Sequence, residues 1–442
     1  MPASKVEMRF LNTLSALRER GYQQQFQTKE SAYSRTSIQK MSFEEAALFM
    51  VGNSDKSLSI ELLDFFNDLP GVREAVTKQA FSKQRKYIKS ELFEDLNSRY
   101  INLVYQEKKE LFYGMLLIAV DGSTVEIPNV GSLREHYGSA KASSTSVSNA
   151  RAGINGFYDP LNHMMLRLVV DKYQKNETKV FLEHLDELVS QYPGEELCFI
   201  FDRGYISLSL LFELEARNLK YLFRVPSSSY KAEIEGAKDK DSIINLKITK
   251  ARLKGVTDEK IETYLRLAHL PERLVKIELD SGETELLITN IQAERVPYDE
   301  MKAFYFRRWE IERMFNVLKN RLHIENISAR TPIGVEQDIQ ATVFLGNVIQ
   351  DAINDANQKL TKSEKARYEY RVNVNMLCGV VKNYFLFFAY NENIDEQLRE
   401  YHYKRIATFI RQTVVAHKTG KKNPRIKRVS RNKHTTNLRK NY

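Results

Sequence analysis

The stretch Met115–Ser123, MLLIAVDGS, decides the fold class of this chain. An unbroken apolar run that ends in an acid and a glycine is typical of a strand buried on both faces of a sheet. The same pattern returns at Glu196–Tyr205, ELCFIFDRGY. The sequence therefore predicts two buried strands, one ending in Asp121 and the other in Asp202.

Other strand and helix patterns alternate around these two runs. Their order along the chain is strand, strand, strand, helix, strand, helix, strand, which predicts an α/β fold with a mixed sheet flanked by helices. Residues 226–283 are polar, and short alternating pieces such as TYLRLAHL at 263–270 predict a β-rich insertion. The other strands are predicted at 150–159, 163–173, 220–226 and 284–291, and the helices at 178–192 and 207–218.

A long helix is predicted to start at the VPYDE segment and to include FYFRRWEIERMFNVLKNRLHIE at 304–325. At about 100° per residue, Tyr305, Arg308, Glu312 and Lys319 fall within about 60° of one another. One carboxylate thus lies among two cations and a phenol, which suits a site that holds a phosphodiester near a metal ligand. The Arg308–Glu312 spacing is also that of an ordinary, weakly stabilising helix pair, but such a pair does not explain the other two residues.

Asp121, Asp202 and Glu312 form a candidate acidic set. An Asp at the end of a buried strand points into the crevice where α/β proteins bind ligands, although each Asp alone is more often a turn or helix-capping residue. Three carboxylates brought together repel one another unless cations neutralise them, and Mg²⁺ binds carboxylate and phosphate oxygens. Two such ions, about 3.5–4 Å apart, would stabilise the attacking and leaving oxygens of a phosphoryl displacement.

Residues 1–105 are predicted to be helical, with amphipathic segments at 43–51, 57–69 and 77–88 separated by short turns. Three short helices of which the third is basic fit a helix-turn-helix arrangement that binds DNA. A plain helical bundle with a solvated basic helix fits the same pattern. In the first interpretation the residues facing the duplex are Gln79, Ser82, Lys83, Gln84 and Arg85.

The composition, 42% hydrophobic and 28% charged, is that of a globular protein. We expect a cytoplasmic protein, because no apolar run approaches the roughly 18 residues needed to span a bilayer and the N-terminus lacks an apolar signal region. Cys198 and Cys378 are expected to be buried free thiols, not a disulfide or a zinc site. The net charge of +10 comes from His417–Tyr442, which holds ten Lys or Arg residues and no acid. This tail is interpreted either as a solvated, disordered segment or as a basic arm that contacts phosphates.

The spacing Tyr305-x2-Arg308-x3-Glu312-x6-Lys319 matches the Y-R-E-K signature of bacterial insertion-sequence transposases of the insertion-sequence-four group. The chain resembles that family over roughly residues 35–355. The resemblance implies a ribonuclease-H-like core that carries an Asp–Asp–Glu triad, with a β insertion before the Glu. It also implies cut-and-paste movement of DNA, in which hydrolytic nicking is followed by attack of a 3′-hydroxyl on a second strand.

The contexts VDGS around Asp121, FDRGY around Asp202 and LLITN before the helix are also similar to that family. Carried over by position, Asp121, Asp202 and Glu312 are implied to be catalytic and to bind two Mg²⁺ or Mn²⁺ ions. The implied partners are double-stranded DNA, namely the terminal inverted repeats and the target, and a second protomer in the synaptic complex. Such a protein would be associated with the nucleoid. The implied contacts to phosphates at the transposon end are Tyr305, Arg308 and Lys319.

The predicted organisation is an N-terminal helical DNA-binding domain over 1–105, a catalytic core with the insertion over 106–332, C-terminal helices over 333–412 and a basic tail over 413–442. A structure-specific nuclease with the same core and an inactive DNA-binding derivative are the alternatives. The presence of all three carboxylates argues against the inactive derivative.

Some members of this family stack a flipped base on an aromatic residue of the insertion, which offsets the cost of extruding the base. The insertion of this chain offers Tyr230 and Tyr264. The only tryptophan, Trp309, lies in the signature helix and is predicted to pack in the core.

Overall fold

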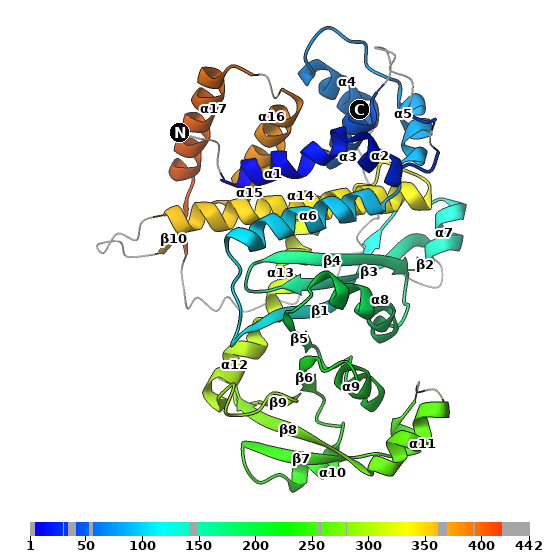
Figure 1. Ribbon diagram of the computed structural model, residues 1–442, viewed down its shortest axis with the longest axis vertical. Helices are drawn as coiled ribbons and strands as arrows, with labels where there is room; N and C mark the ends of the chain where they lie inside the picture. Colours follow the sequence, from blue (N-terminus) through cyan, green and yellow to red (C-terminus); the bar gives the residue numbers. More distant parts are fainter. Residues whose placement is uncertain are drawn as a thin grey trace.

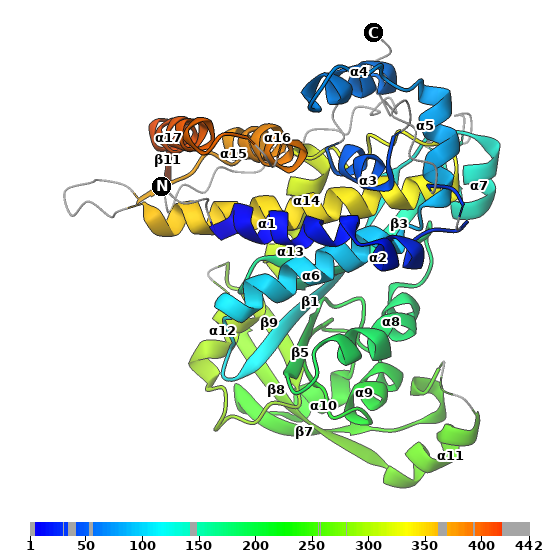
Figure 2. The same ribbon diagram turned by 45° about the horizontal axis from the view of Figure 1, so that its top comes forward.

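The computed structural model describes residues 5–29, 31–33, 41–52, 56–141, 148–254, 256, 258–279, 281–360, 369–391 and 394–417. A layer of helices lies beside one part of a large sheet, and the rest of the same sheet extends away from this layer into a lobe with further helices (Figure 1). The turned view shows α14 (Pro332–Lys359) crossing the molecule between the N-terminal helices and the sheet (Figure 2). The basic tail lies outside the described residues from position 418 onward.

The centre of the molecule is a mixed sheet of nine strands in the order β2-β3-β1-β5-β6-β9-β8-β7, with β4 also paired to β3. β1, β5 and β6 are parallel neighbours, and the remaining pairs are antiparallel. This arrangement confirms the predicted ribonuclease-H-like α/β fold. The strands are β1 (Met115–Glu126), β2 (Ser139–Ala140), β3 (Asn149–Asp159), β4 (Met164–Lys172), β5 (Glu196–Phe201), β6 (Lys220–Val225), β7 (Asp241–Lys247), β8 (His269–Glu278) and β9 (Thr284–Thr289), and β10 (Glu369–Arg371) pairs with β11 (Val415–His417).

Helices cover both faces of the sheet, because successive residues of a strand point to opposite sides. Val120 of β1 belongs to the apolar cluster that includes α8 and α9, whereas Ala119 belongs to the cluster that includes α13 and α14. The helices are α1 (Lys5–Ser15), α2 (Arg20–Gln25), α3 (Phe43–Val51), α4 (Leu58–Asp68), α5 (Lys78–Gln84), α6 (Glu91–Glu107), α7 (Gly131–Tyr137), α8 (Glu177–Gln191), α9 (Leu208–Glu215), α10 (Lys231–Gly236), α11 (Asp258–Leu267), α12 (Tyr298–Phe306), α13 (Trp309–Asn320), α15 (Val374–Val380), α16 (Leu386–Tyr390) and α17 (Glu396–Gln412).

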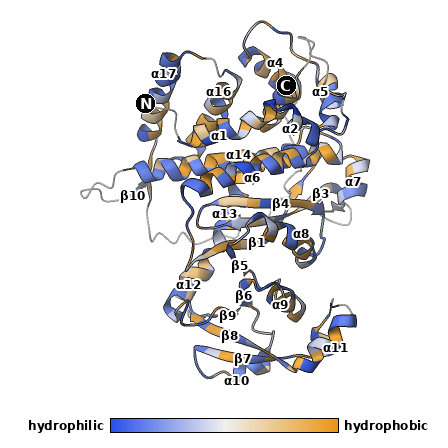
Figure 3. Ribbon diagram, viewed as in Figure 1, coloured by the Kyte–Doolittle hydropathy of each residue, from blue (hydrophilic) through white to orange (hydrophobic). Residues whose placement is uncertain are grey.

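The N-terminal helices pack around α14. α3, α4 and α5 confirm the three amphipathic segments predicted from the sequence. The ring of Phe344 in α14 lies 5.9 Å from Phe10 of α1 and 6.0 Å from Tyr100 of α6, measured between centroids. Figure 3 shows the end of α14 beside β10 in blue, where the helix leaves this apolar core. The N-terminal helices and α14 therefore share one core, and a separate DNA-binding domain over 1–105 stays a prediction.

The insertion adds strands to the edge of the same sheet, since β8 pairs with β9 and β9 with β6. The prediction of a strand at 263–270 is wrong in its first half, which forms the end of α11. Ile261 and Tyr264 lie three residues apart and pack on the same apolar cluster, as on one face of a helix. The Tyr264 ring stacks on Phe212 of α9 with centroids 3.9 Å apart.

The long helix predicted from the VPYDE segment is two helices. α12 ends at Phe306 and α13 begins at Trp309. The amides of Arg307 and Arg308 each donate to the carbonyl three residues earlier, so the chain forms a tightened turn. The prediction of one continuous helix is therefore wrong, and the angles of an ideal helix do not apply across the turn.

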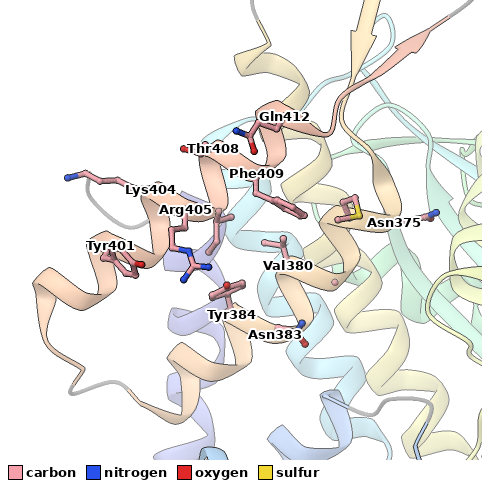
Figure 4. Close-up of a pocket in the computed structure, with 13 residues that line it drawn as sticks. Asn375, Val380, Asn383, Tyr384, Tyr401, Lys404, Arg405, Thr408, Phe409 and Gln412 are labelled. Carbon is pink, nitrogen blue, oxygen red and sulfur yellow. The ribbon is translucent and has the colours of Figure 1, made fainter.

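A cavity of about 690 Å³ lies between α15 and α17, far along the chain from the predicted catalytic residues. Figure 4 shows side chains of both helices turned toward it. None of its lining residues is a predicted site residue, and its lining includes Tyr384, Tyr401, Lys404, Arg405 and Phe409.

Two expectations about the chain as a whole can be compared with the structure. Cys198 and Cys378 are both free and buried, as predicted. Within the described residues, no helix is long and apolar enough to cross a membrane.

Arg85, predicted to face DNA, is buried, and that prediction is wrong. It lies in the 3₁₀ turn Arg85–Tyr87 that follows α5, with 3% of its surface exposed. Its guanidinium donates to Asp338 Oδ1 at 2.7 Å and to Gln337 Oε1 at 2.8 Å, both in α14. It also donates to Ser328 Oγ at 2.6 Å. Arg85 therefore ties the end of α5 to α14.

Arg85→Ala is expected to lower the free energy of unfolding by about 3–5 kcal/mol, because it leaves the buried Asp338 carboxylate without its cation. The exposed neighbour Lys83 provides the control, since Lys83→Ala should change stability by less than about 0.5 kcal/mol. Urea denaturation of the two variants measures the difference. Equal midpoints would contradict the structural role of Arg85.

A buried carboxyl group lies where the insertion joins the core. Glu272 of β8 is 2% exposed, and the Tyr221 hydroxyl of β6 lies 2.5 Å from its Oε1 and 2.9 Å from Glu215 Oε1. One hydroxyl proton cannot serve both acceptors, and Glu215 Oε1 also accepts a hydrogen bond from Asn290 Nδ2 at 2.7 Å. Burial raises the pKa of Glu272 to about 8; the Tyr221 hydrogen bond lowers it and the charge of Glu215 raises it.

Stability is expected to fall as the pH rises from about 5 to about 8. An acid whose pKa is higher in the folded than in the unfolded chain binds its proton more tightly in the folded chain, and so stabilises the fold. This stabilisation is complete below the unfolded-state pKa and is lost as the pH rises to the folded-state pKa. At about 1.4 kcal/mol for each pKa unit between the two states, the loss is on the order of a few kcal/mol. Urea unfolding at pH 5 and pH 8.5 should show a smaller pH effect for Glu272→Gln than for wild type. Identical pH effects in Glu272→Gln and wild type would disprove this role of Glu272.

Candidate active site

The register of the sheet places Asp121 and Asp202 side by side. β1 and β5 are parallel, and their last paired residues are Val120 and Phe201. Asp121 and Asp202 are the next residue of each strand, so their Cα positions are adjacent across the gap where the pairing ends. β1 does not end there as predicted, because Asp121 continues the antiparallel pairing with β3 at Gly156.

Close packing of α13 on β3 brings Glu312 to the same place. Gly156 lies opposite Asp121, and a Cβ at Gly156 would come within 3.1 Å of Phe315 and 3.2 Å of Ile311. The missing side chain thus lets the helix approach the sheet closely. Glu312 lies between these two apolar residues in sequence and is carried to the side of Asp121.

Arg308 links the two acidic residues that these packings bring together. Its Nη2 donates to Glu312 Oε1 at 2.9 Å, and its Nη1 lies 3.5 Å from Asp121 Oδ2. Its residue surface is only 2% exposed, and its guanidinium lies 4.6 Å from the centroid of the Trp309 ring. Arg308 is therefore a fixed positive charge inside the site, held by two carboxylates and an aromatic face.

Tyr305 and Arg224 contact the third carboxylate. The Tyr305 hydroxyl donates to Asp202 Oδ1 at 3.3 Å, and Arg224 Nη1 lies 3.9 Å from the same oxygen. Tyr305 is fully buried, and this burial raises the pKa of its phenol, so the hydroxyl stays a proton donor. Arg224 also pairs with Glu285 at 2.9 Å, and so divides its charge between two acids.

Lys319 completes the signature. Its Nζ donates to Ser123 Oγ at 2.7 Å. Ser123 lies two residues beyond Asp121 and thus on the same face of β1. The lysine ammonium is consequently held beside the acidic group, at Ser123, two residues along β1 from Asp121.

The pKa of Asp121 reflects the charged groups that surround it. Burial raises its pKa to about 6, while Arg308 and the backbone amide of Gly122 lower it. The charges of Glu177 and Glu312 raise it further. Asp121 thus feels two other carboxylates as well as one guanidinium, and the negative charge is only partly neutralised by the protein itself.

The structure therefore brings six of the predicted site residues together in one region, here called the site network. Arg308 contacts Asp121 and Glu312 and lies 6.0 Å from the centroid of the Tyr305 ring, and Tyr305 contacts Asp202. Lys319 joins this group through Ser123 of β1. Tyr305 and Arg308 are buried against carboxylates, and their implied contacts to DNA phosphates stay a prediction. Gln79 and Lys83 lie on the exposed surface of α5, and Arg85 is buried against α14. The six residues of the network are Asp121, Asp202, Tyr305, Arg308, Glu312 and Lys319.

Sequence reasoning missed Glu177, Arg224 and Ser123. Ser123 could have been found, because its position two residues after Asp121 places it on the same strand face. Glu177 and Arg224 belong to other elements and carry no spacing signal. Only the register of the sheet and the approach of α8 bring them to the aspartates.

The aromatic residues differ from the expectations. Trp309 is 39% exposed, so its predicted packing in the core is wrong. In the insertion, Tyr264 is stacked on Phe212, and the Arg252 guanidinium lies 5.1 Å from the centroid of the Tyr230 ring. Each of the two insertion tyrosines therefore already has a partner over its ring.

The donor set fits a divalent ion in chemistry. The side chains of Asp121, Asp202 and Glu312 are 22%, 35% and 44% exposed, so their oxygens can be reached from solvent. Oxygen donors with uncompensated negative charge are what Mg²⁺ and similar hard ions require. As placed, no three His, Cys, Asp or Glu side chains of the described residues are grouped closely enough to hold one ion. Binding would therefore include side-chain movement.

Comparisons with known proteins identify the family of this chain. The family described as "Transposase DDE domain" matches residues 113–347, which include all six residues of the network. The transposase InsG of insertion sequence element IS4 from Escherichia coli K12 is 21% identical over 321 residues, covering 71% of this chain and 68% of that protein. A cryo-EM structure of the piggyBac transposase synaptic complex with hairpin DNA aligns over 91% of this chain and 85% of that one, with a TM-score of 0.44 and 10% identity. The chain belongs to the transposase DDE domain family, enzymes that cleave DNA and transfer the cleaved strands.

Proposed function

We propose that this transposase uses Asp121, Asp202 and Glu312 as the carboxylates that hold its divalent metal ions, preferably two Mg²⁺. The observation that carries the proposal is that three elements distant in sequence bring these carboxylates onto Arg308 and Tyr305, at contacts of 2.9 to 3.5 Å. When bound, the ions would stabilise the attacking and leaving oxygens of a phosphodiester.

The residues around the carboxylates have distinct tasks in this proposal. Arg308 fixes the directions of Asp121 and Glu312, and the Tyr305 hydroxyl fixes Asp202. Lys319 holds its ammonium beside the acidic group, where it can attract a DNA phosphate. These contacts exist before DNA arrives and keep the three carboxylates near one another, and binding of an ion would then move their side chains the rest of the way.

We propose cut-and-paste transposition as the outcome, with terminal inverted repeats and target DNA as substrates and a dimer as the synaptic unit. The exposed residues Gln79 and Lys83 on α5 would contact the ends as part of an N-terminal DNA-binding region. The nucleoid is then the place of action. A nuclease that cleaves without joining strands would use the same carboxylates, and the products of the reaction distinguish the two.

Glu312→Gln is expected to lower strand cleavage by more than about 100-fold, beyond the loss typical of a residue that only orients a ligand. The substrate is a duplex that carries the inverted repeats flanking the gene, and the assay measures nicked and joined strands in Mg²⁺. Binding measured without divalent ions should be unchanged, because the substitution removes a metal ligand and not a DNA contact. Chelation of the metal in wild type should have the same effect as the substitution.

Glu310→Gln is the matched control for this assay. Glu310 is an acid on the same helix turn, and it pairs with Arg313 at 2.6 Å instead of with Arg308. The Glu310→Gln variant should cleave the substrate at the wild-type rate. Cleavage by Glu312→Gln at the wild-type rate would disprove the assignment, and cleavage by wild type without joined products would favour the nuclease.

Lys83→Ala is expected to weaken binding to the transposon end and to reduce the slope of log affinity against log salt by about 1, as for the loss of one phosphate contact. Lys231→Ala is the control, because Lys231 is also an exposed lysine, lies in the insertion and pairs with Glu235 at 3.6 Å. Fluorescence anisotropy over a salt series measures both. Equal slopes for the two variants would remove α5 from the DNA interface.

A further inference from the structure

The cavity between α15 and α17 stays open because the two helices pack loosely. None of the residues Glu396–Gln412 of α17, which the structure describes without gaps, is buried. Tyr401 and Phe409 of this helix remain 54% and 40% exposed. In α15, a Cβ built on Gly379 would meet no described atom within 4 Å. The unfilled volume of about 690 Å³ is in the range of ligand pockets, roughly 300–1,000 Å³.

An uncommon backbone feature forms one wall of the cavity. α15 continues into the π-helical turn Val381–Phe385, and two residues of this turn, Asn383 and Tyr384, line the cavity. Such turns are rare and occur frequently at functional sites. Figure 4 shows Tyr384 and, from α17, Arg405 directed into the space between the helices. The turn thus presents an aromatic ring and an amide to the cavity.

The charged groups of the lining are cations. Lys404 and Arg405 line the cavity, and no Asp or Glu is among the lining residues that the structure describes. Lys404 pairs with Glu400 at 3.0 Å on the exposed surface of α17, where such a pair contributes little. Arg405 forms no ion pair with a described residue, and its guanidinium carbon lies 5.6 Å from the centroid of the Tyr401 ring. The cavity therefore favours a ligand with negative charge.

Rings combined with cations and amides are the groups that bind unpaired nucleotides. Aromatic side chains stack on exposed bases, and cations contact the neighbouring phosphates. Amide side chains form hydrogen bonds with the edges of bases. The bases of a duplex are already stacked on one another, so only a nucleotide outside the duplex can enter the cavity. The rings are Tyr384, Tyr401 and Phe409, and the amides include Asn383 and Gln412.

Two other occupants fit the cavity less well. The basic tail follows β11 in sequence, but it carries ten Lys or Arg residues and no acid, and so would bring cations to Lys404 and Arg405. A second copy of the chain could cover the exposed rings of Tyr401 and Phe409. It would also bury the Arg405 guanidinium, which is costly unless an acid meets it. A nucleotide supplies both a flat surface for stacking and the negative charge.

We propose that the cavity between α15 and α17 is a binding site for unpaired nucleotides of DNA. Tyr401 and Phe409 stack on the base, and Arg405 contacts a neighbouring phosphate. The family of this chain cleaves DNA and transfers the cleaved strands, so strand ends, where bases can unpair, are present during its reaction. None of the lining residues belongs to the site network, so the inference goes beyond the proposed function and does not depend on the three carboxylates.

Binding of a fluorescent thymidine oligonucleotide of about 15 nucleotides to the full-length protein, measured by anisotropy without divalent ions, tests the proposal. An abasic strand of the same length keeps the phosphates and offers no bases. Gly379→Leu should fill the cavity and weaken binding of the thymidine strand by about 5–150-fold, as for the loss of one stacked base. Its affinity for the abasic strand should stay that of wild type. Gly379→Ala is the matched control, because one methyl group leaves most of the cavity open, and it should bind both strands like wild type.

Arg405→Ala gives a second readout that does not depend on filling the cavity. Loss of one phosphate contact should reduce the slope of log affinity for the thymidine strand against log salt by about 0.7. Arg411→Ala is the control, because Arg411 is also exposed on α17 but does not line the cavity. Its slope should equal that of wild type. Equal slopes for the two variants would overturn the phosphate contact and, with it, the proposal.

The Gly379→Leu results decide between the possible occupants. Wild-type affinity for the thymidine strand would show that no base enters the cavity. An equal loss of affinity for the thymidine and abasic strands would show a general effect on the fold, and would also overturn the proposal. Sedimentation identifies a second copy as the occupant if Gly379→Leu dissociates a wild-type dimer and leaves the thymidine affinity unchanged. A loss confined to the thymidine strand supports the nucleotide site.

Discussion

The repulsion between carboxylates that the sheet forces together is the constraint on which the site depends. The parallel register of β1 and β5 leaves Asp121 and Asp202 as neighbours whatever their side chains prefer. Packing of α13 on Gly156 then adds Glu312. Such a group is costly to bury unless cations oppose it, and the protein itself supplies the buried guanidinium of Arg308 and, beside Asp202, the guanidinium of Arg224.

This constraint explains why the signature residues are spaced as they are. The turn between α12 and α13 points Tyr305 toward Asp202 and Arg308 toward Asp121 and Glu312, so each carboxylate has a donor from the same short segment. In one uninterrupted helix, the directions of the Tyr305 and Arg308 side chains would be fixed relative to each other by the helical repeat. The turn therefore lies between the two donors, and both of their side chains are buried against these carboxylates.

Much of this fold could be predicted because it depends on local patterns. Apolar runs identified β1 and β5, and periodicity identified α3, α4, α5, α8 and α9, since residues buried on one or two faces recur at a regular spacing in the sequence. The failures have a common cause. Arg85 and Lys83 look equivalent in a basic helix, and only contact with α14, some 250 residues later by the separation of Arg85 and Asp338, makes one of them structural. Trp309 was likewise predicted to be a core residue, but its ring is partly exposed and contacts the buried guanidinium of Arg308.

The site was predictable to the extent that its members share an element. Tyr305, Arg308, Glu312 and Lys319 could be grouped because one segment carries all four, although the turn within it was not foreseen. Glu177 could not be found in this way, because nothing in the sequence near it refers to Asp121. The sequence feature that accompanies its approach lies in β1, where residue 122 is a glycine and leaves room for the Glu177 carboxylate. A glycine beside a candidate catalytic acid can therefore mark the approach of a group from another element, and here it indicates a carboxylate on the second face of the sheet.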